Sequence, residues 1–236
     1  MNKYLLAFAK NGYIKYTSHL DMQRLFKRLF RRTGIPLSYS AGFNPHPKMS
    51  FAQPLSLGYT AKEELLEFRT EMPLDRQAAL RDLSFAVPQG LDILFLESVP
   101  DEMKSLASAV KAASYRIFLP CSYQENRDKL EEAVLAYKAL PSIRAEKYDK
   151  KTKMAREIEI RDKIQDLSLT DAHGKASLLA LLDTGSQSNL SPELLITSFL
   201  FHSGLPFQRI DMEVCRDYLI FDACIPHSLG LHLEQG

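Results

Sequence analysis

The sequence predicts an α+β fold with antiparallel sheets, because short apolar segments typical of strands alternate with segments whose apolar residues recur at helical spacing. The first hundred residues give the element order β-α-β-β-α-β, which is the ferredoxin-like order. A similar succession starts near residue 115. We therefore predict two ferredoxin-like domains, 1–100 and 114–236, joined by a linker at 101–113.

The elements of the first half follow from apolar runs, alternation and turn signals such as Asn11-Gly12. The predicted strands are 4–9, 37–39, 49–57, 64–70 and 91–96, and the second predicted helix is 74–85.

The first predicted helix has the clearest boundaries. Ser18 is a good N-cap residue, and Asp21 lies three residues later, beside the positive end of the helix dipole. Gly34 and Pro36 end the helix. Apolar and basic residues fall on opposite faces. The apolar face holds Met22, Leu25, Phe26, Leu29 and Phe30, and the basic face holds Arg24, Lys27, Arg28, Arg31 and Arg32.

In the second half, the same patterns predict further elements with less distinct ends. The strict alternation at 157–161 is typical of a half-buried strand, and Ser191-Pro192-Glu193 starts a helix. The predicted strands are 115–119, 142–148, 157–161, 176–182, 207–214 and 218–221, and the predicted helices are 126–139 and 191–201.

Charge is separated along the chain although the net charge is only +1. Residues 1–50 contain nine Lys and Arg and one acidic residue, whereas the remainder contains 21 basic and 28 acidic residues. Such a separation favours a basic surface that binds a polyanion or an acidic partner. The alternative is a solvated helix face whose cations pair with acidic groups elsewhere in the fold.

Several classes of protein are disfavoured by the sequence. No apolar run approaches the roughly 20 residues of a transmembrane helix, and the start does not read as a signal peptide, so we expect a cytoplasmic protein. Cys121, Cys215 and Cys224 are scattered and odd in number, which favours neither disulfides nor a metal motif. Glycine-rich phosphate-binding motifs and a C-x₃-C-x₂-C triplet are absent. We therefore expect no metal or cofactor in this chain and lean toward a non-enzymatic role.

Nucleic-acid binding is favoured by the cations of the first helix and by Lys48. Tyrosine and phenylalanine residues interleave with this region and either stack on unpaired bases or pack in the core. These aromatics are Tyr13, Tyr16, Tyr39 and Phe43. A second basic turn either extends the same surface or is a solvated loop, and it contains Lys147, Lys150, Lys151, Lys153 and Arg156.

Two histidines are candidate catalytic residues. His19 lies in the first turn of the basic helix, and His46 lies in a loop with two prolines. Two such histidines could cleave RNA by acid–base chemistry without a metal, or they could serve only in packing and loop hydrogen bonds. The loop itself is a candidate for positioning a substrate or partner through Gly42, Phe43, Asn44 and His46.

The run SHLDMQRLFKRLFRRTGIPLSYSAGFNPHPKMSFAQPLSLG at residues 18–58 resembles the signature of the radical-SAM-linked conserved bacterial proteins, a family of unknown function. KMAREIEIR at 153–161 resembles a second motif of that family. Its members are stand-alone chains or C-terminal parts of B12-binding radical-SAM proteins. The resemblance implies a radical-SAM partner that holds S-adenosylmethionine and an iron–sulfur cluster. Family members often lie near genes for ribonuclease E/G and ribosomal proteins, which implies a role near RNA.

The tandem element order, the histidine at the first helix and the basic face are also similar to the CRISPR RNA-processing endonucleases. Their glycine-rich C-terminal loop is not evident in this sequence.

Three hypotheses follow. The favoured one is a radical-SAM-associated accessory protein that binds RNA, or presents an RNA or ribosomal substrate, through the basic helix and the 42–48 loop. The second is a metal-independent endonuclease that uses His19 and His46. The third is a module that docks on a radical-SAM enzyme without binding RNA.

Overall fold

The structure is a computed structural model that describes residues 2–149 and 153–234. The protein is a mixed α+β chain with mainly antiparallel strand pairing. It divides into two compact units: unit 1 is 1–111 with 216–236, and unit 2 is 112–215. The chain passes between the units inside strands β5 (Val110–Ser122) and β10 (Glu213–Phe221). The predicted linker at 101–113 therefore includes the short helix α3 (Leu106–Ala109) and the start of β5.

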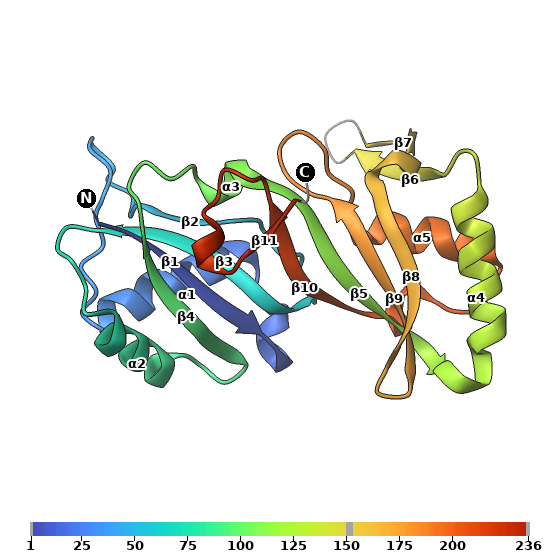
Figure 1. Cartoon of the computed structure of the whole chain (residues 1–236), viewed down its shortest axis with the longest axis horizontal. Coiled ribbons are helices and arrows are strands. Elements are labelled where there is room, and N and C mark those ends of the chain that lie inside the picture. Colours follow the sequence, from blue (N-terminus) through green and yellow to red (C-terminus); the bar gives the residue numbers. More distant parts are fainter. Residues whose placement is uncertain (1, 150–152, 235–236) are drawn as a thin grey trace. The chain divides into compact units, whose positions relative to one another are not determined.

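Unit 1 begins with the predicted order β-α-β-β-α-β. Strand β1 lies between β3 and β4 and is antiparallel to both, and β2 is antiparallel to β3 (Figure 1). The elements are β1 (Asn2–Lys10), a 3-10 helix η1 (Gly12–Tyr16), α1 (His19–Arg32), β2 (Met49–Phe51), β3 (Thr60–Thr70), α2 (Arg76–Ala86) and β4 (Leu91–Val99), and later the 3-10 helix η4 (His227–Leu229) and β11 (His232–Leu233), which runs parallel to β10.

The predicted strands around the loop are shorter than expected. Residues 37–39 make only two isolated bridges, and β2 ends at Phe51 although the prediction extended to residue 57. Pro54 has no N–H group to donate to a neighbouring strand. The carbonyl oxygens of Gln53 and Pro54 instead accept hydrogen bonds from Arg216, at 2.9 and 3.3 Å.

The core of unit 1 is one apolar cluster between the sheet and both helices. The predicted apolar face of α1 is confirmed, since Met22, Phe26, Leu29 and Phe30 are buried and Leu25 packs against the cluster. These rings meet the rings of the strands at close distance: Phe8 and Phe26 have centroids 4.9 Å apart, and Phe30 and Phe68 4.6 Å apart. The opposite face of α1 is thereby directed to solvent.

Unit 2 pairs β5 with β9 and β9 with β8, all antiparallel, while β6 and β7 form a separate two-stranded sheet. Helices α4 and α5 pack on each other, with Tyr137 edge-on to Phe199 at 5.3 Å. The elements are α4 (Tyr123–Ala139), β6 (Arg144–Asp149), β7 (Met154–Glu159), the 3-10 helix η2 (Arg161–Lys163), β8 (Ile164–Ala172), β9 (Lys175–Asp183), α5 (Pro192–Ser203) and the 3-10 helix η3 (Arg209–Asp211).

Two segments of this half differ from the sequence prediction. Strand β8 was not predicted, because its segment is rich in polar residues and buries only Leu167 fully. The predicted strand at 207–214 is wrong over most of its length, since β10 starts at Glu213. There the Arg209 guanidinium binds both carboxylate oxygens of Glu193, at 2.7 and 2.6 Å, and the Met212 carbonyl at 2.7 Å, which holds a 3-10 turn instead.

The end of β7 is held by one carboxylate. Glu159 accepts hydrogen bonds from the Ser142 hydroxyl and from three backbone N–H groups, those of Ile143, Ile160 and Arg161, at 2.9 to 3.2 Å. These donors, first the Ser142 hydroxyl, lower the pKa of Glu159 to about 2.

Candidate nucleic-acid interface

The ends of α1 and its buried face determine which side of the helix carries the basic side chains. Ser18 is the N-cap, as predicted, and its hydroxyl accepts the Asp21 N–H at 3.2 Å. At the other end Gly34 has a φ of +70°, a left-handed conformation that glycine adopts readily. Because the buried face is locked in the core, the five predicted cations are exposed: Arg24, Lys27, Arg28, Arg31 and Arg32.

An open groove of about 1100 Å³ lies between α1 and the end of α2. Arg24, Arg28 and Arg32 line its α1 side, each four residues after the last. This spacing sets them about 6 Å apart along the helix axis and nearly in line. Asp82 and Phe85 line the α2 side. The structure therefore places three of the five predicted cations in one groove, and Lys27 and Arg31 outside its lining.

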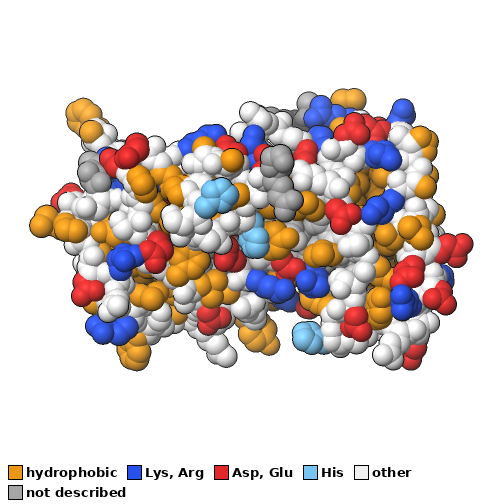
Figure 2. Space-filling view, viewed as in Figure 1, with side chains coloured by type: hydrophobic (Ala, Val, Ile, Leu, Met, Phe, Trp, Pro, Cys, Tyr) orange, Lys and Arg blue, Asp and Glu red, His pale blue; other side chains and the backbone are white. Residues whose placement is uncertain are grey.

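Only part of this charge is neutralised within the protein. Arg24 donates to Asp21 at 2.8 Å, and the pKa of Asp21 is lowered by the Ser18 hydroxyl and then by Arg24. Among the residues that the structure describes, Arg28 and Arg32 make no side-chain hydrogen bond or ion pair. On the face drawn in Figure 2, by contrast, acidic and basic side chains are interspersed. The groove thus has guanidinium groups available for an anionic ligand.

Phe85 is the groove residue that the sequence reasoning missed. Its side chain is 94% exposed, at the end of α2. A helical projection of α2 could have found it, because Phe85 lies two residues, about 200°, from the fully buried Leu83. The Phe85 ring therefore lies on the solvent side of α2 and borders the same groove as the arginines of α1.

The four aromatic residues named from the sequence are all exposed. Of the two roles considered for them, stacking on bases or packing in the core, core packing is therefore wrong. Tyr13 and Phe43 are the most open, and Tyr16 and Tyr39 are more than half exposed. The Lys15 ammonium lies 5.4 Å from the ring centre of Tyr16. The groove lining does not include any of the four.

The loop at 42–48 borders a different cavity, of about 330 Å³, lined by His46, Lys48, Lys3 and Arg69 among others. Backbone hydrogen bonds of 2.8 Å close the loop, from Ser40 to His46 and from Lys48 to Ser38. The candidate partner residues Gly42, Phe43, Asn44 and His46 are exposed at its tip.

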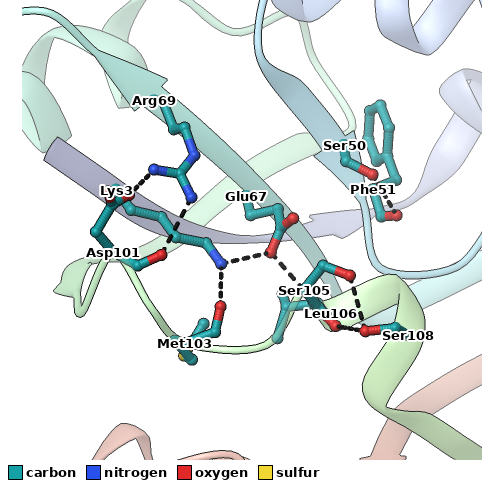
Figure 3. A network of polar contacts seen from close by, with 10 residues as sticks. All are labelled: Lys3, Ser50, Phe51, Glu67, Arg69, Asp101, Met103, Ser105, Leu106 and Ser108. Atoms are coloured by element: carbon teal, nitrogen blue, oxygen red, sulfur yellow. Dashed lines mark hydrogen bonds and ion pairs between the residues drawn. The ribbon is translucent and has the colours of Figure 1, made fainter. Parts of the chain in front are cut away.

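Two of the cations in the wall of this cavity, Lys3 and Arg69, are paired within the protein (Figure 3). The buried Lys3 ammonium donates to the Met103 carbonyl at 2.8 Å and lies 3.4 Å from Glu67, and Arg69 pairs with Asp101. The Glu67 carboxylate also accepts the Leu106 N–H at 3.1 Å. This network fixes β1 and β3 to the segment before α3 and leaves less free positive charge than in the groove.

His19 and His46 line different cavities. His19 borders a cavity of about 20 Å³, large enough for about one water molecule, together with Lys10 and Glu64. Its ring lies edge-on to Phe51 at 5.2 Å, and its Nε2 is 3.1 Å from the Gln23 amide. Burial lowers the pKa of His19, and desolvation lowers that of Lys10. His19 is thus partly buried, beside the buried Lys10 and Glu64.

The second basic turn belongs to the β6–β7 hairpin, where Lys147 is opposite Arg156. Lys153 is exposed, with a left-handed φ of +55°. Lys150 and Lys151 lie outside the described residues. Over the described ranges there is no group of three or more His, Cys, Asp or Glu side chains that could hold a metal ion. In the same ranges no helix is long and apolar enough to cross a membrane.

Comparisons with known proteins identify a family for this chain. Residues 3–192 match the model of a family described as "Uncharacterized protein conserved in bacteria (DUF2344)". No curated protein matches the chain. A crystal structure described as that of a proposed glycine cleavage system transcriptional repressor covers 94% of this chain and 98% of its own, with 7% sequence identity and a TM-score of 0.22. A likeness of that size carries no argument about fold or function.

Proposed function

The chain belongs to the bacterial family DUF2344, and we propose that it binds RNA through the groove between α1 and α2. The observation that carries this proposal is the row of Arg24, Arg28 and Arg32 along one wall of the groove. Guanidinium groups bind phosphate oxygens in pairs of parallel hydrogen bonds and remain charged at all physiological pH values. A row of them with one residue per turn suits a ligand with repeated phosphates.

The groove is also large and open. Its volume of about 1100 Å³ lies at the upper end of the range for small-molecule sites, and its lining follows α1 from Asp21 to Thr33. The carboxylates of Asp21 and Asp82 reduce the charge, but Asp21 is already bound to Arg24. The unpaired Arg28 and Arg32 supply the main attraction in this proposal.

Fluorescence anisotropy with a labelled eight-nucleotide RNA across a salt series tests the proposal. The groove variant is Arg28→Glu with Arg32→Glu, and the matched control is Lys27→Glu with Arg31→Glu, which changes the charge of the same helix equally outside the groove lining. Each phosphate contact contributes about 0.7 to the salt slope for a single strand. Loss of two contacts should therefore reduce the slope by about 1.4 in the groove variant.

The control variant should retain a slope closer to that of the unmodified protein. Equal losses in both variants would show attraction by general charge and would contradict the groove. If the unmodified protein binds no RNA at physiological salt, the proposal fails. The basic face would then be assigned to docking on an acidic protein surface.

Further parts of the proposal rest on the sequence resemblance. We propose a radical-SAM enzyme as partner, with S-adenosylmethionine and the iron–sulfur cluster in that partner, a cytoplasmic location, and the 42–48 loop as the partner contact. A stable complex between the purified proteins in gel filtration would support the partnership. Unchanged elution after mixing at micromolar concentration would refute it.

We also propose that the chain contains two ferredoxin-like repeats. The first repeat is the β-α-β-β-α-β series of unit 1. If the β6–β7 hairpin is an insertion, the elements β5, α4, β8, β9, α5 and β10 give the same order again. Deletion of the hairpin between residues 143 and 160 tests this idea, since an inserted hairpin can be removed with retention of a cooperative unfolding transition.

A further inference from the structure

We infer that Phe85 is a stacking platform for an unpaired base, so that the groove selects single-stranded over double-stranded RNA. This inference rests on the proposed RNA binding and adds to it the class of RNA and the residue that recognises it. Phosphate binding by the arginines of α1 gives no role to the exposed Phe85 ring in the same groove.

Phe85 does not serve the core of unit 1. Helix α2 contacts the core through the buried Ala79 and Leu83 and the partly buried Leu80 and Ala86, whereas the Phe85 ring is 94% exposed. Exposing an aromatic ring forfeits the free energy that its burial would contribute. The position is therefore better explained by a ligand that covers the ring than by folding.

The chemistry of the groove specifies that ligand. One wall offers guanidinium groups, which attract phosphates, and the other offers an aromatic face, which attracts a planar apolar surface. Each nucleotide of a single strand carries a phosphate and a base on the same ribose, and its bases are free to turn toward a ring. In a duplex the bases stack on each other and are hidden from Phe85.

The test compares three labelled probes at one salt concentration by fluorescence anisotropy. They are a cytidine-rich octamer, the same octamer with abasic sites in place of its bases, and the octamer paired with its guanosine-rich complement. The variants are Phe85→Ala, Phe85→Leu and Phe85→Trp. The control is Phe201→Ala, which removes another highly exposed ring, on α5 in unit 2. Because Phe85 is so exposed, its variants should unfold at the same temperature as the parent protein.

Stacking of one base contributes about 1–3 kcal/mol, so Phe85→Ala should weaken binding of the intact octamer by roughly 5- to 150-fold. Phe85→Leu keeps apolar area but not the ring and should lose nearly as much, whereas Phe85→Trp should bind at least as tightly. The abasic octamer and the duplex should bind more weakly to the parent protein and should be insensitive to Phe85→Ala.

The outcomes separate this inference from the proposal beneath it. If Phe85→Ala binds the intact octamer as tightly as the parent while Arg28→Glu with Arg32→Glu does not, RNA binding stands and the stacking role is overturned. If Phe85→Leu binds like the parent, the contact is apolar and not aromatic, which also overturns it. If no probe binds the parent protein, both ideas fail together.

Discussion

Glu64 and Arg216 form a buried ion pair whose loss should be among the most damaging single changes in unit 1. Both side chains are almost fully buried, at 4% and 1% exposed. Arg216 Nε donates to Glu64 Oε1 at 2.7 Å, and a second contact joins its Nη2 to Glu64 Oε2. The guanidinium also bonds the carbonyls after β2, so it ties β10, β3 and the following loop together.

The substitution Glu64→Gln keeps the shape of the side chain but removes its charge. Breaking a buried pair by removing one partner is destabilising by about 3–5 kcal/mol, because the other charge stays buried without compensation. A second buried cation depends on the same carboxylate, since desolvation lowers the pKa of Lys10 and Glu64 acts against that shift. We therefore expect a loss of at least about 3 kcal/mol in the free energy of unfolding.

Urea unfolding at pH 7, followed by far-ultraviolet circular dichroism, measures this loss. Two control variants test whether the burial of the ion pair causes this loss of unfolding free energy. Glu97→Gln breaks the exposed pair with Arg76, in which both side chains are nearly half exposed, and should cost at most about 1 kcal/mol. The double variant Glu64→Leu with Arg216→Met removes both charges and should recover part of the loss. The recovery should be incomplete, because Lys10 still lacks its carboxylate neighbour and the Gln53 and Pro54 carbonyls lose their donor. A Glu64→Gln loss below about 1 kcal/mol would refute the reasoning, because it would mean that the pair is not desolvated.

Three further predictions concern other parts of the chain. Glu159 has a pKa of about 2 in the folded protein against an ordinary 4.5, so its hydrogen bonds stabilise the fold above about pH 4.5 and this stabilisation is lost as the pH falls toward 2. Titration of the Glu159 carboxyl group by NMR measures this pKa, and a midpoint near 4.5 would contradict the prediction. Gly90→Ala should lower the free energy of unfolding in urea more than Gly34→Ala does. Both glycines have a positive φ, but only at Gly90 would the new Cβ lie 2.5 Å from the Asn11 carbonyl oxygen. Equal losses of unfolding free energy in the two variants would rule out the clash. Ser18→Ala should lower the free energy of unfolding by about 1 kcal/mol and Ser18→Asp by much less, because either a hydroxyl or a carboxylate can cap α1. An unchanged midpoint of thermal unfolding in Ser18→Ala would argue against the cap.

The charge separation seen in the sequence needed the structure for its interpretation. Of the nine cations in residues 1–50, Lys3 and Lys10 are buried and donate to backbone carbonyls inside unit 1. Their carboxylate neighbours, Glu67 and Glu64, lie more than fifty residues away in the sequence. A count of charges along the chain cannot tell such cations from those of α1, because burial depends on which strands pair.

The histidine pair shows the same limit for catalytic candidates. Sequence spacing allowed His19 and His46 to share a site, but the structure places them against separate cavities. Phe85 shows the converse, since it lies more than fifty residues beyond the last arginine of α1 and becomes part of the groove only when α2 packs beside that helix. Neither the separation of the two histidines nor the place of Phe85 in the groove can be predicted from the residues next to them in the sequence.

The features of α1 could be predicted from its own segment: its cap, its end at Gly34, its buried face and its exposed cations. The apolar strands β1, β4 and β9 could be predicted in the same way. These features depend on the pattern of residues within one short segment, so that segment contains the information needed. The groove, the buried ion pairs and the polar strand β8 could not be predicted in this way, because each requires contacts between distant segments that strand pairing and helix packing bring together.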